Sequence, residues 1–275
     1  MELSAYLNRI EFVGDPQPDR ATLDALMQAH LRRVPFENLD QQLGTPVSTD
    51  VQSAYKKIVE QQRGGWCFEV NTLFGWALSE IGFKVDYIAG HVGRDGSARS
   101  TPADHKFLLV ECSEPLIVDV GFGGSLFRSL PLAPVSAAQP PYTIDITKED
   151  EGYYRFTETA HGKPFSFDFK PVPVGADHFE AINIQLQMDE NSPFRRTLTA
   201  QTRSKDSHIA LRGRLLKTIK ANGVEESVLP SGQALVCCLK QQFGIDLPDA
   251  ASLWPQVAAR HEELFGARPK DDNKD

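Results

Sequence analysis

The fold is decided by the segment Arg63-Gly64-Gly65-Trp66-Cys67-Phe68-Glu69-Val70-Asn71, which brings one cysteine to the start of a helix. The apolar residues that follow recur with the spacing of a helix that buries one face: Val70, Leu73, Phe74, Ala77, Leu78 and Ile81. Adjacent glycines can adopt backbone angles that other residues avoid, so Gly64 and Gly65 predict a tight turn into this helix. A thiol at a helix N-terminus lies near unpaired backbone N–H groups, which favour the thiolate. Cys67 is therefore a candidate nucleophile.

The alternative for any cysteine is a structural role, because free cysteines usually pack in cores as small apolar residues. Cys237 and Cys238 lie in an apolar helical stretch and Cys112 lies in a polar turn, so these three are expected to be structural. Only Cys67 has glycines before it and a helix after it. A nucleophilic role for Cys67 also requires a histidine and an orienting group elsewhere in the chain.

Two apolar runs further along the chain supply these partners. Residues 105–111 begin with His105, and residues 116–122 contain Asp119. The residues between the runs have turn chemistry, so the pair predicts a β-hairpin. With a turn centred on Cys112 or within one residue of it, His105 and Asp119 become cross-strand neighbours on one face. Opposed Cβ atoms in such a ladder are about 5 Å apart, and diagonal side chains remain in reach.

Each of these residues has an alternative interpretation. Asp104 competes as the orienting group of His105, but successive side chains on a strand point to opposite faces, so Asp119 is preferred. An aspartate in an apolar strand needs a partner, and the alternative for Asp119 is a strand-end residue that caps a turn made by Gly121 and the glycines after it. The alternative for His105 is a hydrogen-bonded histidine of the core.

Cys67, His105 and Asp119 resemble the Cys-His-Asp triad of the arylamine N-acetyltransferase family. The resemblance covers nearly the whole chain, and its most specific parts are the segment RGGWCFEVN and the aspartate strand from Leu116 to Gly124, with Asp-Val-Gly-Phe-Gly intact. Shorter matches are Tyr6-Leu7-Asn8-Arg9-Ile10, His30 with Val34-Pro35-Phe36-Glu37-Asn38-Leu39, Asn191-Ser192-Pro193-Phe194, and Gln242-Phe243-Gly244-Ile245.

The resemblance implies an α+β fold in three parts, similar to the papain and transglutaminase core. Residues 1–82 would form a helical bundle with the nucleophile, residues 83–185 a β-barrel with the histidine and aspartate, and residues 186–275 an α/β lid with a disordered tail. The periodicity agrees, since it is helical up to about Ile81 and β-rich from Phe83 to Lys170. Beyond these segments it predicts a strand at 197–202 and helices at 232–243 and about 253–265.

The family activity implied is N-acetylation of arylamines and arylhydrazines with acetyl-CoA as the acyl donor, and O-acetylation of N-hydroxyarylamines. The two half-reactions would share one site in a ping-pong mechanism through an acetyl-cysteine. One alternative is a cysteine hydrolase or transglutaminase-like acyl transferase that uses the same triad. Another is a catalytically inactive binding protein on the same scaffold.

Family positions that line the acceptor pocket match Phe36, Val92, Phe122 and Phe194, although such residues are also ordinary core residues. The resemblance also places coenzyme contacts at Thr101, Asp104 and Gly123. Two departures from the family pattern bear on specificity. The first is Asp104, which stands where a small uncharged residue is common. The second is His91, which stands where an arginine is usual.

Composition narrows the function classes further. A net charge of -8 over 275 residues offers no basic surface for nucleic acid, and hydrophobic residues at 41% can build two or three cores. The N-terminus lacks a signal-peptide pattern and no run reaches the ~20 apolar residues of a membrane span, which indicates a cytoplasmic protein with no membrane partner. Four cysteines without paired spacing suit a reducing compartment, and the absence of a Cys-x-x-Cys motif argues against zinc, so no metal is expected. The choice between monomer and homo-oligomer stays open.

Overall fold

The N-terminal part of the chain is helical in the computed structural model, which describes residues 1–93, 99, 102–123 and 126–266. Its helices are α1 (Leu3–Arg9), α2 (Arg20–Arg33), α3 (Leu39–Gln42), α4 (Val51–Tyr55), the π-helical segment η1 (Lys56–Glu60) and α5 (Cys67–Ile81). Aspartate side chains cap two of them, because Asp19 accepts from the Thr22 N–H and Asp50 accepts from the Gln52 N–H.

Helix α5 begins at Cys67, as the sequence predicts, but it is buried on more than one face. Every residue from Cys67 to Gly75 is buried, including the polar Glu69, Asn71 and Thr72. The prediction of one buried face is wrong for this half of the helix, because α5 packs against α4 as well as against the strands of the barrel. The helix ends at Gly82, whose φ of 105° is the left-handed conformation of a glycine C-cap.

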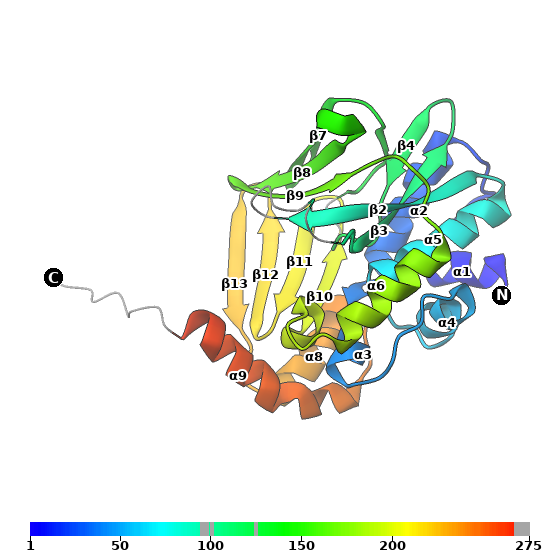
Figure 1. Cartoon of the computed structure of the whole chain (residues 1–275). Coiled ribbons are helices and arrows are strands. Elements are labelled where there is room, and N and C mark those ends of the chain that lie inside the picture. Colours follow the sequence, from blue (N-terminus) through cyan, green and yellow to red (C-terminus); the bar gives the residue numbers. More distant parts are fainter. Residues whose placement is uncertain (94–98, 100–101, 124–125, 267–275) are drawn as a thin grey trace.

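An eight-stranded antiparallel sheet forms a nearly closed barrel above the helices (Figure 1), in the order β5-β4-β3-β2-β9-β8-β7-β6. Its strands are β2 (Lys84–Gly93), β3 (His105–Glu111), β4 (Pro115–Val118), β5 (Leu130–Pro131), β6 (Val135–Gln139), β7 (Tyr142–Lys148), β8 (Tyr154–Ala160) and β9 (Lys163–Phe169). Phe107, Phe156 and Phe167 are buried in its core, and the ring of Phe167 contacts the other two.

The β3–β4 hairpin has the predicted register. Glu111 pairs with Pro115, so the turn is centred on Ser113, within one residue of Cys112. Leu108 pairs with Val118, which sets Asp119 opposite Phe107 and makes His105 its diagonal neighbour. The predicted second strand is too long, however, because β4 ends at Val118 and Asp119 is the first residue after it. There the Asp119 side chain accepts from the Gly121 N–H and turns the chain.

The C-terminal part contains α6 (Ala176–Met188), α7 (Pro193–Arg196) and a second sheet of five strands. The sheet order is β1-β10-β11-β12-β13, with β1 (Phe36–Glu37), β10 (Thr199–Arg203), β11 (Ser207–Arg212), β12 (Leu215–Lys220) and β13 (Gly223–Val228). Helix α8 (Gly232–Phe243), η4 (Pro248–Leu253) and α9 (Trp254–Phe265) lie at the end of this sheet away from the barrel (Figure 1). The α+β fold of bundle, barrel and α/β lid is therefore confirmed.

Strand β1 belongs to the N-terminal part of the sequence but pairs with β10, and Phe36 lies opposite Gln201. The N-terminal and C-terminal parts of the fold are thus joined by main-chain hydrogen bonds. The boundaries at residues 82 and 185 stay predictions.

The four cysteines are all free, and their burial differs from the prediction at one position. Cys67 and Cys238 are buried and Cys112 is half-buried, but Cys237 is exposed because it lies on the outer face of α8. The predicted disordered tail from Lys270 lies outside the described residues. Within the described ranges, the helices are all too short or too polar to cross a bilayer.

Candidate active site

Three elements bring Cys67, His105 and Asp119 together. Cys67 is the first residue of α5, His105 is the first residue of β3, and Asp119 follows β4. The His105 Nε2 lies 2.6 Å from the Asp119 Oδ2, and the side chains of Cys67 and His105 are hydrogen-bonded. Each residue is no more than 3% exposed. This geometry suits an imidazole held between a thiol and a carboxylate.

The protonation of His105 follows from these partners. Burial disfavours the imidazolium, but the Asp119 charge and the hydrogen bonds to Asp119 and Cys67 outweigh it and raise the pKa of His105 to about 10. At neutral pH the His105 ring is therefore the positively charged imidazolium. A cation beside Cys67 stabilises the thiolate, which is the reactive form of a cysteine.

The two oxygens of Asp119 have separate partners. Oδ2 contacts His105, while Oδ1 accepts from the Gly121 N–H at 2.7 Å and from the Asn71 Nδ2 at 3.0 Å. The Asp119 side chain thus makes both the hydrogen bond expected of a turn cap and the contact with His105 expected of an orienting group. Because Oδ1 is held by two donors, Oδ2 has a fixed direction toward the imidazole.

Asn71 is a site residue that the sequence analysis did not single out. It is fully buried, its Nδ2 donates to the Lys106 carbonyl at 2.6 Å, and its Oδ1 accepts from the Val120 N–H at 3.1 Å. The amide therefore ties α5 to both β3 and the loop after β4. Its signal in the sequence is its position four residues after Cys67, which places both side chains on the same face of α5.

The glycines before Cys67 are required for a different reason from the one predicted. Neither Gly64 nor Gly65 has a positive φ, so no special backbone angle is involved. A Cβ on Gly64 would lie 2.1 Å from the Pro35 carbonyl oxygen, and one on Gly65 would lie 2.8 Å from the Glu69 Oε2. The pair is needed because other parts of the chain approach it closely.

Aromatic rings surround the predicted site. The ring of Phe122 lies 4.8 Å from the His105 ring and that of Phe167 lies 5.0 Å from it. Phe36 and Phe194 belong to the apolar cluster around Cys67, with ring centroids 6.4 Å apart. These rings make the surroundings of Cys67 and His105 largely apolar.

Val92 is the fourth predicted acceptor-pocket residue, and it is half-buried on β2. It pairs with Phe167 of β9 and packs against the barrel core. Phe36 and Phe194 thus share an apolar cluster with Cys67, Phe122 contacts His105, and Val92 is the cross-strand partner of Phe167, whose ring contacts His105.

The predicted coenzyme residues have three different settings. Thr101 lies outside the described residues. Asp104 is half-buried and accepts from the Val92 N–H at 3.3 Å, and burial raises the pKa of its carboxyl. Gly123, with a φ of 79°, is buried so closely against Gln201 that a Cβ would lie 2.5 Å from the Gln201 Oε1. The coenzyme contacts therefore stay predictions.

Lys106, the residue after His105, is a buried cation that the sequence analysis did not note. Its Nζ donates to the Thr72 Oγ1 at 2.6 Å and lies 4.2 Å from the ring centroid of Tyr87 and 4.7 Å from that of Phe179. Burial lowers its pKa to about 8, and the nearby Cys67 opposes this shift. Across the described ranges, no carboxylate forms an ion pair with this ammonium.

An open groove of about 750 Å³ lies elsewhere, between α1, α2 and the end of α8. Its lining includes Arg9, Arg32 and Lys240 but none of the three residues of the predicted triad. We therefore place the candidate site by chemistry, at Cys67, and not by the size of a cavity.

The family model of the N-acetyltransferases matches residues 19–252 of this chain. The chain belongs to the arylamine N-acetyltransferase family. The arylamine N-acetyltransferase of Mycolicibacterium smegmatis is 33% identical over 96% of this chain and 98% of its own length. As a member of this family, the chain is an acyltransferase.

Solved structures of the arylamine N-acetyltransferase family have the same fold. That of the Salmonella typhimurium enzyme aligns with a TM-score of 0.86 and 29% identity over 94% of this chain and 98% of its own. The Mycobacterium marinum enzyme in complex with CoA aligns with a TM-score of 0.86 and 27% identity over 96% of this chain and 99% of its own.

Proposed function

We propose that this arylamine N-acetyltransferase transfers the acetyl group of acetyl-CoA to aromatic amines through an acetyl-Cys67 intermediate. The observation that carries the proposal is the contact of Cys67 with His105 and of His105 with Asp119, in a chain of this family. The complex of the M. marinum relative with CoA supports coenzyme A as the donor. No step needs a metal ion.

In the first half-reaction the Cys67 thiolate attacks the carbonyl carbon of the acetyl thioester. A new carbon–sulfur bond forms, the bond to the coenzyme sulfur breaks, and the leaving thiolate takes the proton from His105. The raised pKa of His105 supports this step, because the proton is present at neutral pH. The products are acetyl-cysteine and free coenzyme A.

In the second half-reaction the nitrogen of the acceptor attacks the acetyl-Cys67 carbonyl. The amine proton passes to His105, the carbon–sulfur bond breaks, and the Cys67 thiolate is restored. Asp119 holds the imidazole in one orientation in both half-reactions, since its second oxygen is fixed by Gly121 and Asn71. Both acyl transfers use one thiol, so the kinetics are ping-pong.

The acceptor class follows from protonation and from the aromatic walls. Aromatic amines and arylhydrazines are weak bases and arrive unprotonated at neutral pH, whereas alkylamines arrive as ammonium ions. Moving an ammonium ion from water to the apolar surroundings of Phe36, Phe122 and Phe194 costs free energy, and these rings do not replace its hydration. We expect anilines, aminosalicylates and arylhydrazines to be acetylated, and N-hydroxyarylamines to be acetylated on oxygen.

The test combines thiol release with intact-mass analysis. Incubation with acetyl-CoA should add one acetyl group to the protein, peptide mapping should place it on Cys67, and an arylamine should remove it and accelerate coenzyme release. Cys67→Ala should stay folded and take up no acetyl group. Acetyl on Cys237 or Cys238, or a clear preference for alkylamines, would contradict the proposal. Cleavage of peptides with no reaction on the thioester would favour the hydrolase alternative.

A further inference from the structure

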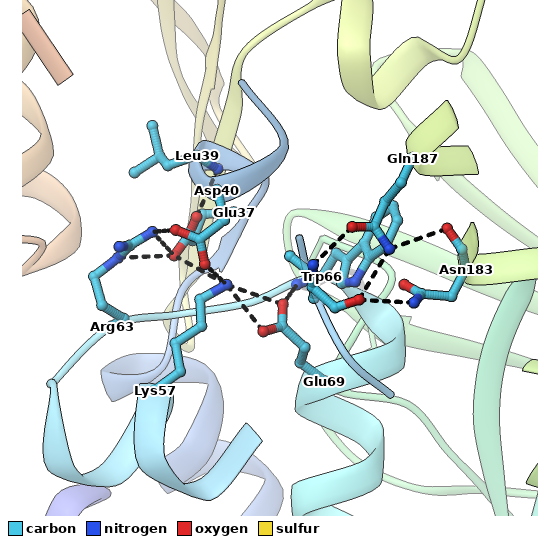
Figure 2. Close-up of polar contacts among 10 residues, drawn as sticks. Glu37, Leu39, Asp40, Lys57, Arg63, Trp66, Glu69, Asn183 and Gln187 are labelled. Atoms are coloured by element: carbon cyan, nitrogen blue, oxygen red, sulfur yellow. Dashed lines mark hydrogen bonds and ion pairs between the residues drawn. The ribbon is translucent and has the colours of Figure 1, made fainter. Parts of the chain in front are cut away.

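A network of five charged side chains, four of them buried and one half-buried, lies beside Trp66, the residue before Cys67 (Figure 2). It comprises Glu37, Asp40, Lys57, Arg63 and Glu69, which come from β1, α3, η1, the loop before the cysteine and the first turn of α5. None of these residues has a role in the transfer steps above. Burying so many charges is costly unless each is paired, so the network needs an explanation.

Lys57 is the centre of the network. Its Nζ lies 2.9 Å from the Glu69 Oε1, 3.0 Å from the Glu69 Oε2 and 2.7 Å from the Asp40 Oδ2. Arg63 completes the network, because its Nη2 lies 2.8 Å from the Glu37 Oε1 and 3.0 Å from the Asp40 Oδ1. Three carboxylates thus share two cations. With all five ionised, the network carries one uncompensated negative charge.

Glu69 connects this network to the nucleophile. It is the third residue of α5, and its Oε2 accepts from the backbone N–H of Trp66 at 3.2 Å. This is the returning hydrogen bond of a capping box, which fixes the residue that precedes the helix. Cys67 stands between the two bonded residues. The absence of a Cβ on Gly65 lets the Glu69 carboxylate lie against the turn.

We propose that Glu69 is a positioning residue for Cys67, and that uptake of one proton by the Glu37–Asp40–Glu69 carboxylates loosens the cysteine turn and slows attack by the thiol. The inference rests on the proposed role of Cys67 as acyl carrier. Protonation removes the charge that Lys57 and the Trp66 N–H both bind, so it weakens both contacts of Glu69 at once.

The charges around Glu69 identify where the proton goes. Lys57 of η1 faces it directly, Glu37 of β1 and Asp40 of α3 face it across Lys57, and Arg63 binds the latter two. Burial, the largest cause, and the charges of Glu37 and Asp40 raise the pKa of Glu69 to about 7 against the opposing effect of Lys57. Lys57 and Arg63 bring the pKa of Asp40 below its usual value despite burial. Glu69 therefore takes the proton.

The test measures the rate at which iodoacetamide alkylates Cys67 between pH 5.5 and 8.5, with peptide mass mapping to isolate this cysteine. Glu69→Gln mimics the protonated carboxyl, and Glu80→Gln on an exposed turn of the same helix is the matched control. The wild type and Glu80→Gln should show an inflection near pH 7. Glu69→Gln should lack it and react about 3- to 30-fold more slowly at pH 8, the factor expected for loss of a helix-cap interaction.

A second measurement keeps the inference testable if Glu69→Gln fails to fold. In a Cys67→Ser protein, which has no thiol at this position, the backbone amide resonance of Trp66 should titrate with a midpoint near pH 7. A Trp66 resonance that does not move between pH 5 and 9, or a Glu69→Gln alkylation profile that superimposes on the wild type, would overturn the inference. Failure of Cys67 to accept acetyl would count against the proposed function alone, because alkylation needs no acetyl donor.

Discussion

Two buried lysines beside the cysteine helix have opposite surroundings. Lys57 lies among the carboxylates of Glu37, Asp40 and Glu69, whereas Lys106 lies among Thr72 and the rings of Tyr87 and Phe179. Burial disfavours the charge of both. Carboxylates outweigh burial at Lys57 and raise its pKa above the usual range, while at Lys106 burial prevails and lowers the pKa to about 8. Burial alone therefore does not decide how a charge behaves.

The first prediction removes the carboxylate beside His105, so that this buried cation, like Lys106, has no carboxylate partner. Asp119→Asn keeps the shape of the side chain but leaves the buried imidazolium without a carboxylate. We expect acetyl transfer to fall by about 10³- to 10⁴-fold, as loss of the corresponding charge does in other triads. Steady-state coenzyme release measures it. Asp104→Asn, which alters a carboxylate that faces Val92, is the control and should affect the chemical step far less.

The second prediction removes the cation that three carboxylates share. Lys57→Met should lower the free energy of unfolding by about 3–5 kcal/mol at pH 7, because Glu69 and Asp40 lose their closest counter-ion in a buried setting. Denaturant titration measures the loss. Lys56→Met, on the exposed side of the same segment, is the control. A loss below about 1 kcal/mol would contradict the central role of Lys57 in this network.

The third prediction concerns the lysine without a carboxylate. Lys106→Met should raise the free energy of unfolding by about 1–2 kcal/mol at pH 7, because an apolar chain replaces a desolvated ammonium. The gain should shrink as pH rises from about 8 to 10.5. In that window the folded wild type binds fewer protons than the unfolded chain, so its stability increases with pH. The contribution of Lys57 to stability depends on pH in the opposite way. Because its pKa is raised in the folded state, its charge stabilises the fold at neutral pH, and this stabilisation is lost as pH rises above the usual pKa of lysine.

The smallest expected effect concerns the aromatic wall near Cys67. Phe194→Ala removes a ring that lies 5.1 Å from Trp66, and we expect acceptor KM to rise about 3- to 10-fold with little change in the first half-reaction. Arylamine titration at saturating acetyl-CoA measures this. An equal loss in the acetylation of Cys67 would mean that the ring supports the nucleophile and not the acceptor.

The local parts of this site could be predicted from the sequence. The start of α5 at Cys67 follows from an apolar period, and the contact of His105 with Asp119 follows from a hairpin whose turn lies within a few residues of both. Each inference joins residues that are close in the sequence or share one strand pair.

The remaining parts depend on residues that are distant in the sequence. Nothing in the segment around Cys67 indicates that Lys57 would meet Glu37 and Glu69, or that Pro35 would approach Gly64 closely enough to exclude a Cβ. The role of Asn71 depends on where β3 and the loop after β4 cross α5. Such contacts are set by packing of the three parts and not by local periodicity.

The pairing of β1 with β10 has a consequence for synthesis on the ribosome. Gly65, two residues before Cys67, accepts from the Glu37 N–H and donates to the Pro35 carbonyl, so the cysteine turn is held by β1. The other side of β1 finds its partner at Gln201 only after most of the chain has been translated. Because the earlier parts of a nascent chain fold first, we expect the cysteine turn to be completed late. The reactive thiol would thus reach its working geometry only when the rest of the enzyme is present to shield it.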